Sequence, residues 1–219
     1  MDDLVQAALT KWPDVPHCYG WLGLDARGVW RMRDAQAQEH NAAGDKIRNA
    51  ALLGFINRNY LHDQQGRWYF QNGPQRVYVN LEATPYIART SPDLGLLLHT
   101  GVAMDEVTAA YLTQAGQLIL RAGDTLAQMD DRDLAACLAS ASIDGKPASD
   151  EALMTWLANT PATSPAETTE STEATGATMS ITLATTRQYE INVQRGELAE
   201  LMQECGYEAR PQPDQDAAK

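Results

Sequence analysis

The stretch of residues 66–86 constrains the fold more than any other part of the chain, because its residues, GRWYFQNGPQRVYVNLEATPY, alternate in character around a tight turn. In the first half, Trp68 and Phe70 fall on one side of an extended strand and Tyr69 falls on the other, and the second half alternates in the same way. A period of two is typical of half-buried strands. Residues 72–75 between the halves read Asn-Gly-Pro-Gln, and Asn-Gly accepts the positive φ of a tight turn. The stretch therefore predicts a β-hairpin.

Turn residues at 25–28 and 114–116 predict two more hairpins of this kind. Residues 107–112, at the start of the third hairpin, would also suit a helix, because Asp105 and Glu106 are acidic residues of the kind that favours a helical first turn. Apolar residues at helical spacing predict four helices in the first 158 residues, at about 2–11, 49–60, 130–140 and 149–157.

The hairpins and helices also echo one another along the chain. Gly28, Gly66 and Gly116 are each followed, two positions later, by a bulky apolar residue. This echo favours a repeated unit of hairpin plus helix, although Gly-x-apolar is common after turns in any β protein. The predicted fold is therefore α+β, with short antiparallel β-hairpins that are each packed by a helix, either as a repeated ββα unit or without a repeat. Residues 34–46 are small and polar, and we expect a loop there.

The composition changes between residues 159 and 178, a run that contains no aromatic residue and neither Lys nor Arg. Such a run cannot bury enough apolar surface to offset its chain entropy, so we expect a flexible linker. The predicted division is a main α+β domain over 1–158, which could split into 1–100 and 101–158; a linker over 159–178; a ββα tail over 179–208, which either completes the main core or forms an appendage; and disordered residues over 209–219.

Charge and cysteine content bear on partners and compartment. The chain has 17 Lys+Arg against 29 Asp+Glu, and its net charge of -12 disfavours nucleic acid and anionic membrane as partners. Its three cysteines, Cys18, Cys137 and Cys205, lie far apart, which fits reduced thiols better than a disulfide framework. The acidic start lacks the features of a secretory signal, and no stretch approaches the ~20 apolar residues of a membrane span. A cytoplasmic location is expected.

The sequence contains no phosphate-binding glycine loop, dinucleotide fingerprint or nucleophile elbow. The most reactive pair is His17 with Cys18, since a thiol beside an imidazole could bind a metal or act as a nucleophile. Neighbouring side chains usually point apart, however, and a structural role is favoured. Asp130, Asp131 and Asp133 could bind a divalent cation, but helix capping explains them equally well. No catalytic, cofactor-binding or metal-binding residue is therefore assigned, and no cofactor is expected.

Aromatic residues crowd the first half of the chain, and most of them are expected in the core. Tyr69 and Tyr78 differ, because both fall on the hairpin face away from Trp68, with Arg76 nearby. Together with His17 and Cys18, these three residues are our candidate patch for a ligand or partner protein.

Three runs resemble a family of uncharacterised proteobacterial proteins, the one catalogued as domain of unknown function 2946. They are KWPDVPHCYGWL at 11–22, FINRNY at 55–60 and WYFQNGPQRVYV at 68–79. The resemblance covers roughly the first 100 residues and implies no activity, because that family has none established. Residues 74–88 also resemble, through fewer residues, a second uncharacterised bacterial family of repeated hairpin-and-helix units. That resemblance implies a repeated fold and a role in signalling.

These observations favour a cytosolic binding or regulatory module that recognises a protein or small ligand and performs no chemistry. The alternative is an enzyme or metal-dependent protein that uses His17 and Cys18 with residues brought close by folding. A third hypothesis is a structural partner in which the acidic linker tethers the tail. The identity of the ligand or partner and the oligomeric state are not specified by any motif.

Overall fold

The computed structural model describes residues 1–104, 106–161, 177–183 and 189–214. The described chain is a mixed α+β structure, and it divides into two compact units. Unit 1 consists of Met1–Pro85 and Gly206–Lys219, and unit 2 consists of Tyr86–Cys205. Unit 2 is thus inserted, along the sequence, between two parts of unit 1. Of the expected linker at 159–178, residues 162–176 lie outside the described part of the chain.

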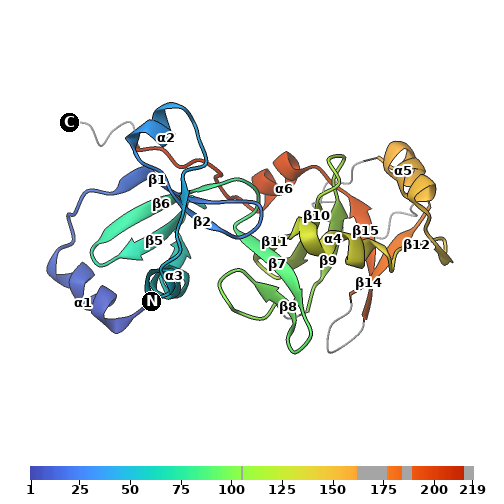
Figure 1. Ribbon diagram of the computed structural model, residues 1–219, viewed down its shortest axis with the longest axis horizontal. Coiled ribbons are helices and arrows are strands. Elements are labelled where there is room, and N and C mark those ends of the chain that lie inside the picture. Colours follow the sequence, from blue (N-terminus) through green and yellow to red (C-terminus); the bar gives the residue numbers. More distant parts are fainter. Residues whose placement is uncertain (105, 162–176, 184–188, 215–219) are drawn as a thin grey trace. The chain divides into compact units, whose positions relative to one another are not determined.

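Unit 1 contains a six-stranded sheet and three helices (Figure 1). In spatial order, the strands are β3 (Asp45–Lys46), β2 (Trp30–Met32), β1 (Cys18–Leu24), β6 (Gln75–Leu81), β5 (Trp68–Asn72) and β4 (Tyr60–His62). The helices are α1 (Asp3–Lys11), α2 (Ala35–Glu39) and α3 (Ala50–Arg58).

The hairpin predicted at residues 66–86 is confirmed. Strands β5 and β6 pair in antiparallel fashion with Tyr69 opposite Tyr78, and Gly73 in the turn has a φ of 57°. The hairpin of β1 and β2 is confirmed as well.

Helix α3 covers the face of this sheet that carries Phe70. Its N-cap residue, Asn49, accepts a hydrogen bond from the Leu52 amide at 2.9 Å, which satisfies one of the free donors of the first turn. The rings of Phe55 and Phe70 then meet edge to face at 5.3 Å. Pairs of this kind add about 0.5–1.5 kcal/mol beyond the area that they bury. The aromatic residues on this side are therefore core residues, as expected.

Residues 34–46 do not form the expected loop throughout, because they contain α2 and β3. The side chain of Asp34 caps α2 by accepting a hydrogen bond from the Ala37 amide at 2.7 Å. No residue of this short helix is buried, so it leaves no apolar periodicity in the sequence.

Unit 2 contains a nine-stranded sheet and three helices. In spatial order, the strands are β13 (Lys146–Pro147), β12 (Ser142–Ile143), β14 (Met179–Leu183), β15 (Tyr189–Arg195), β9 (Ala109–Leu112), β10 (Leu118–Ala122), β11 (Thr125–Met129), β7 (Tyr86–Ser91) and β8 (Gly95–Leu98). The helices are α4 (Asp131–Leu138), α5 (Asp150–Asn159) and α6 (Leu198–Glu204).

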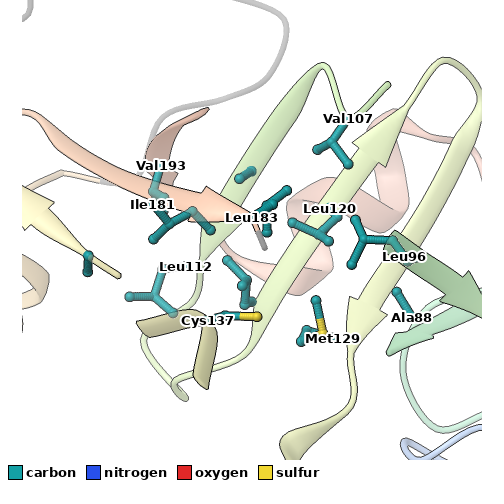
Figure 2. Close-up of a cluster of buried hydrophobic side chains, with 14 of the residues drawn as sticks. Ala88, Leu96, Val107, Leu112, Leu120, Met129, Cys137, Ile181, Leu183 and Val193 are labelled. Carbon is teal, nitrogen blue, oxygen red and sulfur yellow. The ribbon is translucent and has the colours of Figure 1, made fainter. Parts of the chain in front are cut away.

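The third hairpin pairs β9 with β10, so residues 109–112 form a strand and the helical alternative is wrong. Strands β14 and β15 lie inside the sheet, between β12 and β9. Both strands of the predicted tail therefore belong to the nine-stranded sheet of unit 2. The hydrophobic core of unit 2 contains side chains from the predicted tail, from the third hairpin and from α4. Figure 2 shows one of each, namely Leu183, Leu120 and Cys137.

The antiparallel hairpins are joined by parallel pairs that the sequence does not predict. Strand β1 pairs with β6, β7 with β11 and β9 with β15, and all three pairs are parallel. A hairpin pattern fixes the local partner of a strand but carries no information on the distant strand at its other edge.

A repeated ββα unit is not shown in the described residues. Among these residues, no helix is long and apolar enough to cross a membrane.

Candidate functional site

The face of the unit 1 sheet opposite α3 carries a group of five side chains that we call the tyrosine–arginine cluster. Tyr69 and Tyr78 face each other across β5 and β6, and successive side chains of a strand point to opposite faces, so both point away from the face of Trp68 and Phe70. Strand β1 contributes Tyr19, the residue before β5 is Arg67, and β6 also contributes Arg76; the five members are thus Tyr19, Arg67, Tyr69, Arg76 and Tyr78.

Tyr78 is the centre of the cluster. Its ring stacks on that of Tyr19 at 4.5 Å with an angle of 10° between the planes, and the ring of Tyr69 meets it edge-on at 5.7 Å. The ring of His17 approaches from a further side at 5.8 Å. These contacts leave Tyr78 only 1% exposed and Tyr69 only 6% exposed. The two tyrosines predicted as a patch are therefore buried within the cluster.

Both arginines of the cluster lie over tyrosine rings. The guanidinium carbon of Arg67 is 5.0 Å from the ring centre of Tyr78, and that of Arg76 is 4.7 Å from the ring centre of Tyr69. A cation over an aromatic face gains about 0.5–2 kcal/mol, more when water is excluded. The arginines thus hold the tyrosine rings in place while their positive charges remain on this face.

Asp63 supplies a negative charge next to the cluster, and the local turn explains why it does so. Its carboxylate accepts hydrogen bonds from the amides of Gln65 and Arg67, both at 3.0 Å, as Asp side chains often do within a turn. The other carboxylate oxygen accepts from Nε of Arg67 at 2.8 Å and from the hydroxyl of Tyr78 at 3.1 Å. Burial alone would raise the pKa of Asp63, but these hydrogen bonds outweigh burial and hold the pKa below its usual value. Asp63 is therefore ionised at neutral pH.

Burial and the same charges shift the other titrating groups. Burial, followed by the neighbouring Tyr78, raises the pKa of Tyr19 to about 12, so its hydroxyl stays protonated at neutral pH. Partial burial lowers the pKa of His17, and the positive charges of Arg76 and Arg67 lower it further. His17 is consequently neutral at pH 7 and adds no charge to this face.

The end of the described chain brings a second carboxylate to the cluster. Residues 206–214, which we call the C-terminal segment, follow α6 as the red trace in Figure 1. The sequence predicts disorder from residue 209, yet the carbonyl of Ala209 accepts a hydrogen bond from the Leu81 amide at 2.8 Å. Oδ1 of Asp214 accepts from Nη1 of Arg67 at 2.8 Å. Residues 215–219 lie outside the described part. The cluster therefore already holds one acidic side chain from a distant part of the sequence.

Four of the five residues predicted for a partner patch meet in this structure, namely Tyr69, Tyr78, Arg76 and His17. The fifth, Cys18, is aligned with Val77 of β6, whose side chain points to the face opposite Tyr78. The alternation of the sheet thus directs the thiol of Cys18 away from the cluster that His17 joins.

The residues that sequence reasoning missed are Tyr19, Asp63, Arg67 and Asp214. Asp63 has a local signal, because an Asp three residues before Gly66 is typical of a turn. Arg67 also has one, because it lies two residues before Tyr69 and so on the same face of the strand. Tyr19 and Asp214 join the cluster only through contacts between distant parts of the chain.

In a second predicted group, at Asp130, Asp131 and Asp133, Asp130 is the N-cap of α4 and Asp131 and Asp133 lie in its first turn. The carboxylate of Asp130 accepts from the Arg132 amide at 3.0 Å and pairs with the Arg132 side chain. The carboxylate of Asp133 accepts from the Thr90 amide at 2.7 Å. These contacts favour the capping interpretation. The described residues contain no group of three or more His, Cys, Asp or Glu side chains that could hold a metal ion.

A model of one protein family matches residues 1–212 of the chain, and that family is described as "Protein of unknown function (DUF2946)". The match extends beyond the first 100 residues and confirms the first resemblance seen in the sequence. The second, weaker resemblance is not confirmed. No curated protein matches the chain.

Two solved structures are similar to the chain, and both are described as DUF1285 family proteins. The one from Silicibacter pomeroyi DSS-3 has a TM-score of 0.41 at 14% sequence identity, and the match covers 65% of this chain and 86% of that one. The one from Shewanella baltica OS155 has a TM-score of 0.37 at 13% identity, with 52% and 86% covered. Neither similarity assigns a function.

Proposed function

The chain belongs to this family of proteins of unknown function (DUF2946), and we propose that it is a non-catalytic cytoplasmic binding or regulatory module whose tyrosine–arginine cluster recognises an anionic group on a protein or small ligand. The cytoplasmic location is part of the proposal, because three widely separated free thiols suit a reducing compartment.

The observation that carries the proposal is that Arg67 binds two carboxylates at once. Nε of Arg67 donates to Asp63 and Nη1 donates to Asp214, both at 2.8 Å. The two arginines of the cluster contribute two positive charges and Asp63 contributes one negative charge, which leaves one positive charge for an acidic group to balance. This local positive charge contrasts with the net charge of -12 of the whole chain. Guanidinium groups are also the preferred partners of carboxylates and phosphates.

The chemistry of the cluster supports recognition rather than catalysis. The hydroxyl of Tyr19, with its pKa of about 12, is a poor base at neutral pH. The hydroxyl of Tyr78 is already committed to Asp63, and arginine does not exchange its proton in proteins. Apart from the imidazole of His17, the groups on this face can therefore orient and neutralise an anion but are poorly suited to move a proton.

The proposal is tested with the full chain carrying Asp214→Asn, which removes the internal acidic charge and keeps the chain length. We expect succinate and an acidic peptide to shift the Nε–Hε signals of Arg67 in the NMR spectrum of this variant. The matched control is Asp150→Asn, an equivalent change at an exposed position in unit 2. If neither ligand moves the arginine signals at millimolar concentration, the cluster is purely structural and the proposal is wrong.

A further inference from the structure

We infer that the C-terminal segment is an internal ligand of the tyrosine–arginine cluster, and that the partner is an extended acidic peptide that replaces it. This inference rests on the proposed function and adds the class of partner and the means by which the site is closed. It is drawn from the way in which residues 206–214 lie on unit 1.

The segment begins with backbone contacts that any peptide could reproduce. The Glu208 amide donates to the Gly66 carbonyl at 3.1 Å, and Arg67 and Glu208 form an isolated parallel β-bridge. The approach is so close that a Cβ built on Gly66 would lie 1.6 Å from the Gly206 carbonyl oxygen, and Gly66 has a φ of +73°. Only glycine fits at this position. The start of β5 is therefore shaped to receive an extended chain.

The middle of the segment combines a backbone contact with buried side chains. The Leu81 amide donates to the Ala209 carbonyl at 2.8 Å, and the residues on either side of this contact, Tyr207 and Pro211, are buried. Arg210 lies in the wall of a pocket of about 270 Å³ together with Leu24, Asn80 and Glu82. Main-chain hydrogen bonds with alternate side chains held in pockets are the usual way in which a sheet binds an extended peptide.

Two prolines, Pro211 and Pro213, lie in the last four residues before the segment ends. Proline fixes φ near an extended value, and it has no backbone N–H that would need a hydrogen-bond partner. The segment therefore loses little conformational freedom when it lies on the sheet. A partner peptide with similar prolines would also lose little conformational entropy on binding.

Release of the segment begins at its end, where its ion pair is exposed. The side chain of Asp214 is 59% exposed, whereas that of Arg67 is 10% exposed. An ion pair with one exposed partner typically changes an equilibrium by a factor of about five or less. A tethered segment acts at an effective concentration in the millimolar range. A free acidic peptide with a dissociation constant well below that range can consequently take the place of Asp214.

The experiment compares the full-length wild-type protein with Asp214→Asn, with Asp150→Asn as the matched control. The probe is an acetylated and amidated peptide with the sequence of residues 206–214, GYEARPQPD, and a second peptide that ends in Asn instead of Asp. Two quantities are measured: the dissociation constant of the peptide, and the hydrogen-exchange rate of the Leu81 amide, which reports on release of the segment without any ligand.

We expect Asp214→Asn to speed exchange at Leu81 and to tighten peptide binding by up to about fivefold, while the peptide that ends in Asn binds more weakly to both proteins. Equal peptide affinity and unchanged exchange in the two proteins would overturn the internal-ligand inference and leave the proposed function intact. Faster exchange without any peptide binding would overturn the proposed function. A dimer that forms with rising concentration and is lost in Asp214→Asn would show that the occupant comes from a second copy, which also contradicts the inference.

Discussion

The two sheets of this protein use their faces differently. In unit 2, the successive residues Leu118, Ile119 and Leu120 of β10 are all 0% exposed, so both faces of this central strand are covered by apolar packing. In unit 1, one face is apolar under α3, whereas the other is built from tyrosines, arginines and a buried carboxylate. A face closed by hydrophobic packing has little left to offer a ligand. A face closed by charges and hydroxyls can exchange one polar partner for another, and the proposed binding site accordingly lies in unit 1.

The largest effect that would sharpen this comparison comes from Arg67→Met. The side chains of Arg67 and Asp63 are only 10% and 9% exposed, and removal of one member of a buried pair typically costs about 3–5 kcal/mol. We expect native-state hydrogen exchange to show this loss in the amides of β5 and β6. The double variant Asp63→Leu with Arg67→Met leaves no buried charge, but it also removes the acceptor of the Tyr78 hydroxyl and of two turn amides, so it should recover only part of the loss. A loss below about 1 kcal/mol would mean that the charges are not part of the packing of unit 1.

The counterpart in unit 2 is Leu120→Ala, which leaves a cavity in an apolar core. We expect a loss of about 2–5 kcal/mol in the amides of β9 and β10, with no change in peptide or succinate binding at unit 1. The matched control is Val102→Ala, a truncation of an aliphatic side chain that is 60% exposed and should change stability little. If Leu120→Ala abolished binding without unfolding unit 1, the assignment of function to unit 1 alone would fail.

A smaller effect is expected from Tyr78→Phe, which removes a single hydroxyl from the centre of the cluster. That hydroxyl donates to Asp63 at 3.1 Å, and loss of a hydrogen bond to a charged group costs about 1.5–3 kcal/mol. Arg67 still pairs with Asp63 in the variant, so the low end of this range is expected. Measurement by hydrogen exchange in unit 1, beside Tyr69→Phe as the control, separates loss of the hydrogen bond from loss of ring packing.

Alkaline pH tests the same face through Tyr19. Its pKa is raised to about 12 in the folded protein, above the usual value near 10, so the unfolded chain releases this proton first. The unfolded state then binds fewer protons than the native state, and stability falls as the pH rises from about 10 to 12. Burial raises the pKa values of Tyr69, Tyr86 and Tyr111 in the same direction.

The part due to Tyr19 is measured as the difference in slope between the wild type and Tyr19→Phe in a pH series of unfolding free energies. We expect this difference to approach one proton. An unchanged slope in Tyr19→Phe would show that Tyr19 is solvated like a free tyrosine.

The smallest expected effects are those on which the two units should agree. Asn49 caps α3 in unit 1 by accepting from the Leu52 amide, and Ser149 caps α5 in unit 2 by accepting from the Ala152 amide. Substitution of either by Ala should cost about 0.5–2 kcal/mol, measured as the loss of helix protection in hydrogen exchange. A clear inequality between the two variants would point to packing of one cap residue beyond its hydrogen bond.

The sequence predicts the hairpins and the helix starts, because these features depend on residues that are close together along the chain. The turn at Asn72-Gly73 and the alternation around it specify the hairpin, and Asn49 and Ser149 mark helix starts because their side chains suit a cap. The sequence also predicts that Tyr69, Tyr78 and Arg76 share one face of the hairpin, because this follows from the period of two alone.

Contacts between distant segments are not encoded in such local patterns. The parallel pairing of β1 with β6 brings Tyr19 onto Tyr78 across almost sixty positions in the sequence, and the ion pair of Arg67 with Asp214 spans 147. Polar side chains such as these give no periodic signal, and a polar C-terminal stretch resembles a disordered tail until its partners are known. The burial of Tyr78 was not predicted for the same reason, since Tyr19 and His17, which contact its ring, lie far away in the sequence.

The insertion of unit 2 within unit 1 has a consequence for synthesis of the chain. A ribosome makes all six strands of the first sheet before it begins Tyr86, and it reaches Gly206 only after the whole insert has been made. At about 5–20 residues per second, the nascent protein carries the tyrosine–arginine cluster without its C-terminal segment for on the order of ten seconds. If the cluster binds acidic peptides as proposed, an acidic stretch within reach, including one of the growing polypeptide itself, would meet no competition from Asp214 during that interval.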